Sequence, residues 1–215
     1  MTDQLTLKSR QVSTYGWLCL AAGLLGAASG IYLAVVSPAV GDDQWSYPLS
    51  PTGFVWLQVW FVVQHVGLVL GLLAVWSAGV VGRSGLGRSG HVLAVGGMVG
   101  LTLTELAAIV ARDDDMNTTR VAVLGAVYGV VTVAAGIGLV LEGVAAVRDG
   151  VWDGWRRWLL LITGVWVFVP MMPTLALSFL GARLAITGWM LLFAALGWAL
   201  VRQHSPHGGS SPPRG

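Results

Sequence analysis

Apolar residues fill six long stretches of this chain, and polar residues gather in the short segments between them. A bilayer core of about 30 Å is crossed by about 20 apolar residues in a helix, which is close to the length of each stretch. The stretches lack the alternation of polar and apolar residues that membrane β-strands require. We therefore expect helices near Tyr15–Ala39, Gly53–Val81, His91–Ala111, Val121–Val147, Trp158–Leu180 and Leu184–Val201.

Composition agrees with this pattern, because 55% of the residues are hydrophobic and 10% are charged, with a mean hydropathy of +0.75. Such a chain has too little polar surface to coat a water-soluble globule. Backbone polar groups in lipid must be hydrogen-bonded within their own segment, so the spans must be helical. The predicted fold class is all-α: a polytopic integral membrane bundle of six transmembrane helices, with the lipid bilayer as its main partner.

Basic residues indicate the orientation, because short cytoplasmic connections are enriched in Lys and Arg. Nine of them fall on one side, and three, Arg112, Arg120 and Arg183, fall on the other. We therefore expect a cell-membrane protein with both termini in the cytoplasm. A cleaved signal peptide is the alternative for the first stretch, because Lys8 and Arg10 precede it.

The predicted organisation has three parts. Residues 1–14 form a cytoplasmic segment, residues 15–202 form the six-helix domain, and residues 203–215 form a tail rich in Gly, Ser and Pro that we expect to be disordered. Eleven arginines against one lysine are typical of a GC-rich genome, which suggests a bacterial source.

Several classes of ligand are disfavoured. The basic residues are scattered singly, so we expect no nucleic-acid partner. The lone cysteine, Cys19, allows neither a disulfide framework nor a multi-cysteine metal site. His91 lies roughly 15 Å or more from the level of His65, which disfavours a transmembrane diheme site. We therefore expect no metal and no cofactor.

The leading candidate site combines Glu105 with His65 and Gln58. An ionised carboxylate near the bilayer centre loses several kcal/mol of solvation, so Glu105 should face the bundle interior and find a partner. Glu105 lies roughly 6 Å from the centre of its helix and His65 is nearly central, while Gln58 shares the face of His65. We therefore predict a contact between His65 and Glu105, which would be able to exchange a proton near neutral pH.

Two alternatives remain for these residues. The pair can be a structural hydrogen bond that holds two helices together without any turnover. Glu105 can also snorkel outward or pair with Arg112. The other glutamate, Glu142, lies six residues before Arg148 and is expected at the cytoplasmic interface, within reach of water.

Further candidates come from the aromatic and broken segments. Pro170 and Pro173 should interrupt the fifth helix, and Thr174 beside them can bond to a ligand or to its own helix. Trp60 and Trp166 lie within spans and can line a pocket for an aromatic, cationic or isoprenoid-like ligand, although packing against lipid is the simpler role.

Glycines spaced one helical turn apart recur in the first four helices and predict close helix packing, either within the bundle or in a homo- or hetero-oligomer. The pairs are Gly26 and Gly30, Gly67 and Gly71, Gly96 and Gly100, and Gly125 and Gly129.

Three functions fit these features. The first is binding or transport of a small hydrophobic or protonatable molecule through the polar site at His65 and Glu105, with Gln58, Trp60, Trp166 and Thr174 as further ligand-binding candidates. The second is an intramembrane acid–base enzyme, an isomerase or cyclase acting on a lipid-like substrate, with Glu105 and His65 as candidate catalytic residues. The third is a non-catalytic subunit or assembly factor that docks a partner helix through a glycine face.

Overall fold

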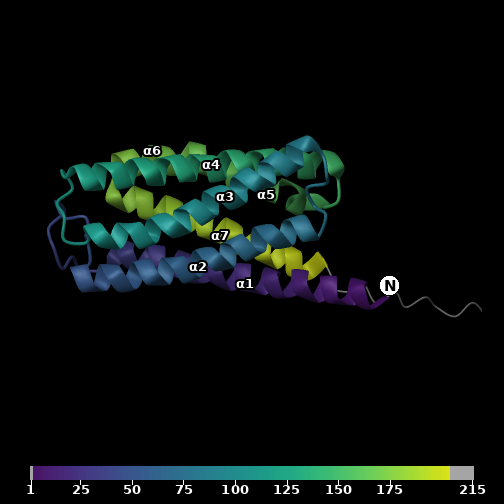
Figure 1. The fold of residues 1–215 in the computed structure, drawn as a ribbon, viewed down its shortest axis with the longest axis horizontal. Helices are drawn as coiled ribbons and strands as arrows, with labels where there is room; N and C mark the ends of the chain where they lie inside the picture. Colours follow the sequence, from purple (N-terminus) through teal and green to yellow (C-terminus); the bar gives the residue numbers. More distant parts are fainter. Residues whose placement is uncertain (1, 204–215) are drawn as a thin grey trace, which may run out of the picture.

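The computed structural model describes residues 2–203, which form a bundle of long helices (Figure 1). Within this range, six helical segments are long and apolar enough to cross a membrane. The predicted all-α, six-helix membrane bundle is therefore confirmed. The elements are α1 (Thr2–Val35), α2 (Pro51–Ser77), α3 (Gly85–Ala108), η1 (Ile109–Ala111), α4 (Thr119–Asp149), η2 (Gly154–Trp158), α5 (Leu159–Trp166), η3 (Val167–Met171), α6 (Met172–Leu177) and α7 (Phe179–Gln203).

The first helix is longer at its start than the hydropathy predicts. It begins at Thr2 instead of near Tyr15, because the polar residues before the apolar stretch include no Gly or Pro that would break a helix. It ends at Val35, shortly before Pro38, whose ring disfavours helical backbone in the preceding residue. The tail expected to be disordered lies, after Gln203, outside the described residues.

The fifth span is interrupted where its prolines predict. Elements η2, α5, η3 and α6 together form this span, and η3 is a π-helical turn that contains Pro170. The Thr174 hydroxyl donates to the carbonyl of Pro170 at 2.7 Å and so satisfies backbone freed by the break. Ser178 has an extended backbone and alone joins this span to α7.

Small residues set the closest helix contacts, but only some of the predicted pairs take part. Gly67 and Gly71 of α2 lie against Ala22 and Cys19 of α1, as predicted. In contrast, Gly96, Gly125 and Gly129 face open space. The tightest contact between α3 and α4 uses other residues instead, namely Ala94, Gly97, Ala135 and Gly138, whose backbones approach each other. We call these four residues the α3–α4 seam.

The two ends of the bundle differ. The start of α1 and the end of α7 lie at one end, which we call the terminal end (Figure 1). At the opposite, distal end, the connection from 36 to 50 pairs with the connection from 112 to 118. Met116 N–H donates to the Asp43 carbonyl at 2.7 Å, and Trp45 N–H donates to the Asp114 carbonyl at 3.0 Å. These two connections form the distal cap.

Candidate functional site

A polar cluster lies inside the distal half of the bundle, where α2, α3 and α4 meet. The Tyr128 hydroxyl donates to Glu105 Oε2 at 2.7 Å. Gln58 Nε2 donates to the Tyr128 oxygen at 3.2 Å and lies 3.4 Å from the Glu105 backbone carbonyl. Glu105 is 7% exposed and Gln58 is 4% exposed. The buried carboxyl group therefore has a partner, as its solvation cost requires.

Arg183 of α7 completes this group, which we call the distal cluster (Gln58, Glu105, Tyr128 and Arg183). Its guanidinium interacts electrostatically with Glu105 and Tyr128, although the structure contains no direct ion pair between Arg183 and Glu105. The guanidinium carbon lies 4.8 Å from the centre of the Phe179 ring. The distal cluster therefore holds two opposite charges near each other without direct contact, and their attraction offsets part of the cost of burial.

The distal cap closes over this cluster. The Trp45 ring lies 6.4 Å from the ring of Tyr128 and 6.5 Å from that of Phe54. Trp45 Nε1, Ser46 Oγ and Arg183 Nε are all buried, and none of them has a hydrogen-bond partner in the structure. Buried polar atoms are rarely left unpaired, because each costs about 1–3 kcal/mol. Hydrogen-bonding capacity therefore remains unused at this end of the bundle.

The predicted hydrogen-bonded contact between His65 and Glu105 is absent. His65 is buried, yet its Nδ1 makes no hydrogen bond of acceptable geometry, and its polar neighbour is the Phe61 backbone one turn earlier on α2. Gln58 is the α2 residue that reaches Glu105. Seven residues separate Gln58 from His65, which is about 10 Å along a helix, so His65 lies too deep. The depth of a residue in the bundle is therefore better predicted from its distance to the ends of its helix than from the middle of the apolar stretch.

The alternative partner for Glu105, Arg112, is also engaged elsewhere. Its Nε donates to Asp113 Oδ2 at 3.1 Å in the distal cap.

The remaining ligand-binding candidates have their polar atoms satisfied by the protein. Trp60 Nε1 donates to Ser29 Oγ at 2.9 Å, and Trp166 Nε1 donates to the Ala185 carbonyl at 2.8 Å. The Thr174 hydroxyl bonds back to its own helix. Trp60 and Trp166 thus link neighbouring helices, and Thr174 satisfies a backbone carbonyl of its own helix. None of the three forms a hydrogen bond with the distal cluster.

A second buried acidic site, at the terminal end, differs from the expectation for Glu142. Glu142 is 0% exposed, and its Oε1 lies 2.7 Å from Nδ1 of His91. The Trp76 ring stacks on His91 with the ring centres 4.9 Å apart. Glu142 is not at the water interface, because α4 continues to Asp149 and packs against α3 at this depth. We call His91 and Glu142 the terminal pair.

A sequence signal for the terminal pair does exist. His91 follows the start of α3 by about as many residues as Glu142 precedes the end of α4. Because antiparallel neighbours place such positions at one level, matching residues from the helix ends finds this pair.

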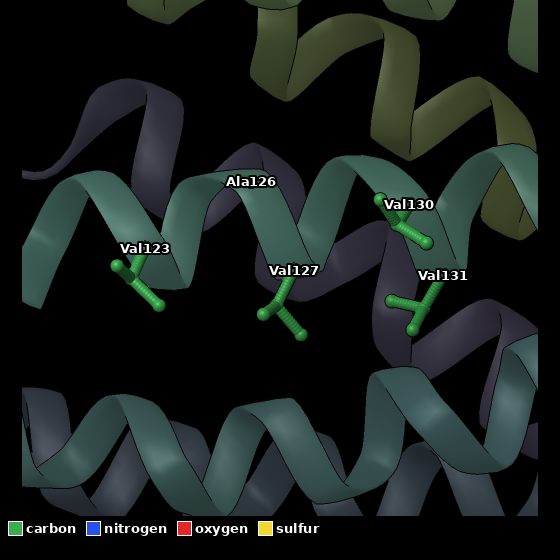
Figure 2. A pocket seen from close by; sticks show the side chains of 5 residues that line it. All are labelled: Val123, Ala126, Val127, Val130 and Val131. Carbon is green, nitrogen blue, oxygen red and sulfur yellow. The ribbon is translucent and has the colours of Figure 1, made fainter.

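An apolar groove runs along the distal half of α4, beside the distal cluster. Figure 2 shows Val123, Val127 and Val131 pointing into the space between α4 and the helix next to it. Val127 and Val131 of this groove flank Tyr128 in the sequence, and Val130 is 69% exposed. The lining residues are Val123, Ala126, Val127, Val130 and Val131.

Comparisons with protein-family models, with curated proteins and with solved structures gave no match for this chain, so the site must be interpreted from its own geometry.

Proposed function

We propose that this integral membrane protein binds or transports a small hydrophobic or protonatable molecule at the distal cluster. One observation carries the proposal: Glu105 and Arg183 lie in one buried group without a direct ion pair, beside unpaired hydrogen-bonding atoms. A structural pair alone would use its partners fully, since unpaired buried groups are costly. A ligand that presents both a protonated and an accepting group would satisfy them.

Each residue has a role in this proposal. The Glu105 carboxylate receives the protonated group of the ligand. The Tyr128 hydroxyl holds that carboxylate in place, and the Gln58 amide holds the Tyr128 hydroxyl. Arg183 Nε and Trp45 Nε1 donate to an accepting group. The apolar body of the ligand lies against hydrophobic side chains, for which the groove on α4 offers an open apolar surface.

The proposed setting is the cell membrane with both termini in the cytoplasm, supported by the excess of Lys and Arg at the terminal end. In that orientation the distal cap and the cluster beneath it face the outside of the cell.

An acid–base enzyme is the second candidate, favoured by the 2.7 Å hydrogen bond between the Tyr128 hydroxyl and Glu105. A carboxyl group and a phenol in direct contact, shielded from water, can pass a proton to and from an isoprenoid or similar lipid-like substrate. A non-catalytic subunit is the third candidate, favoured by Gly125 and Gly129 on an open face of α4.

One experiment separates these candidates. Wild-type protein and the variants E105Q and G125V are placed in vesicles, and uptake of the fluorescent amine 9-aminoacridine is measured alongside conversion of added polyprenyl lipids. Lost uptake in stable E105Q supports transport, and lost conversion supports the enzyme. Normal behaviour of E105Q, with a changed oligomeric state of G125V, would contradict both and favour the subunit.

A further inference from the structure

The antiparallel helices α3 and α4 carry two polar contacts at opposite ends. His91 and Glu105 lie on α3, and Glu142 and Tyr128 lie on α4. Residue 91 is fourteen residues from 105, and residue 128 is fourteen residues from 142, so the two contacts have the same spacing on both helices. That spacing corresponds to about 21 Å along a helix.

The two contacts are separated by apolar packing. The α3–α4 seam lies between them, with backbones in close approach at Gly97 and Gly138. Met98 and Leu139 on the same stretch are 0% exposed. A proton therefore has no chain of polar side chains to follow along this stretch, and the terminal pair is a site in its own right.

The chemistry of the terminal pair depends on one proton. Glu142 Oε1 is bonded to His91, while Glu142 Oε2 is buried with no hydrogen-bond partner. With one proton shared between them, the carboxyl group and the imidazole are together neutral. Without that proton, the pair carries a negative charge in an apolar environment, which costs several kcal/mol. Holding a proton therefore stabilises this part of the bundle.

No other cation replaces that proton among the described residues. His91 is the ionisable group that interacts with Glu142. Arg88 on α3, Arg148 on α4 and Arg157 on η2 all lie exposed at this end, and Arg157 donates to the backbone carbonyl of Val147 at 2.7 Å. From α2, the uncharged ring of Trp76 covers His91.

A path for proton exchange is present on one side only. The side chain of His91 is 13% exposed, whereas that of Glu142 is 0% exposed. Of the two groups, only the imidazole therefore has an edge outside the protein at which a proton can be exchanged. His91 is thus placed to take up a proton at Nε2 while its Nδ1–H donates to Glu142.

We propose that His91 and Glu142 form a proton-binding site, separate from the distal cluster and loaded from the terminal end through His91. Before uptake, the neutral imidazole donates its Nδ1–H to the Glu142 carboxylate. The bound proton then adds at Nε2, which makes an imidazolium–carboxylate pair, and it leaves again from Nε2. The site does not depend on the function proposed for the distal cluster.

The test follows the His91 ring directly. The full chain, labelled with 15N-histidine, is placed in lipid nanodiscs, and the ring nitrogen signals are recorded between about pH 5 and 8. The His91 signal is identified by its loss in H91N. We expect this signal to change reversibly with pH in the wild type. In E142Q the change occurs at a different pH, because the carboxylate partner is gone, whereas in the control E105Q it occurs at the same pH as in the wild type.

Two outcomes would overturn the proposal: a His91 signal that is constant over this range, or one that titrates identically in wild type and E142Q. If E142Q fails to fold, Trp76 provides a second measurement on folded protein. A protonated imidazole quenches a stacked indole, so a pH-dependent part of the tryptophan emission should be lost in W76F and in H91N. Emission whose pH dependence is the same in wild type and W76F contradicts the proposal.

Discussion

The distal cluster and the terminal pair bury a glutamate each between the same two helices, yet they do so in different ways. Glu142 depends on one partner, His91, and its second oxygen has none. The free-energy cost of burying Glu105 is offset by interactions with Tyr128, Gln58 and Arg183, which come from three other helices. The terminal pair, in which Glu142 has one partner, is therefore suited to binding a single proton. The distal cluster has several partners and unpaired donors nearby, so it can form hydrogen bonds to a larger ligand.

Helix packing explains the difference. In the α3–α4 seam, a Cβ at Gly138 would overlap the Ala94 backbone, so the helices touch there. In the distal half, Gly125 and Gly129 meet no neighbouring atoms, and a groove opens along α4. The position of small residues on facing surfaces, more than their number, decides where space remains.

The largest effect should come from removing a sole partner. H91A leaves Glu142 buried alone, and we expect a loss of about 3 kcal/mol or more in stability, because breaking a buried pair exposes the full cost of the remaining charge. Y128F at the distal cluster should cost only about 1 kcal/mol, since Gln58 and Arg183 remain. Thermal unfolding of the purified variants measures both. Equal losses would contradict the contrast between the two sites.

A second substitution tests whether the H91A loss arises from the orphaned charge. In H91A/E142Q the carboxylate is absent as well, so we expect the double variant to recover about 1 kcal/mol or more relative to H91A. A double variant less stable than H91A would show that lost packing, not charge, dominates.

Space along α4 can be tested next. G138L places a side chain in the α3–α4 seam and should destabilise the bundle by about 1–3 kcal/mol. G125L, on the same helix, faces open space and should change stability by less than about 0.5 kcal/mol. The pair is compared by thermal unfolding in one lipid. A larger loss for G125L would mean that this face is occupied by a partner.

The smallest effect concerns the cap. In W45F the buried Nε1, which has no hydrogen-bond partner, is removed while the ring contact with Tyr128 is largely kept. We expect stability to change by less than about 0.5 kcal/mol or to rise slightly, because no hydrogen bond is lost. Binding of an amine that also carries a hydrogen-bond acceptor should weaken, because the Trp45 N–H is proposed to donate to that acceptor. A large loss of stability would instead assign Trp45 a purely structural role.

The sequence predicts the fold well, because hydropathy is a local property that each span displays by itself. It also predicts that Glu105 is buried, since solvation cost follows from the residue and its depth. It fails on partners, which depend on relative depth: placing His65 level with Glu105 required an error of only about 10 Å, or seven residues. Glu142 was misplaced for a similar reason, because nothing local in the sequence shows that α3 packs against it at that depth.

Two members of the distal cluster give weaker signals in the sequence. Tyr128 lies in an apolar stretch, where a tyrosine is not unusual, and no neighbouring residue in the sequence identifies it as the partner of Glu105. Arg183 appears only as a charge in a short connection, whereas the structure places it partly buried at the start of α7. Both are recognisable only after α3, α4 and α7 are packed together.

The most direct measurement compares binding of 9-aminoacridine to wild-type protein, E105Q and H65N in lipid nanodiscs by fluorescence anisotropy. If the distal cluster is the binding site, E105Q binds at least about tenfold more weakly, a change of about 1.4 kcal/mol, while H65N binds as the wild type does. Folded E105Q that binds with wild-type affinity, or an equal loss in H65N, would contradict the assignment of this site.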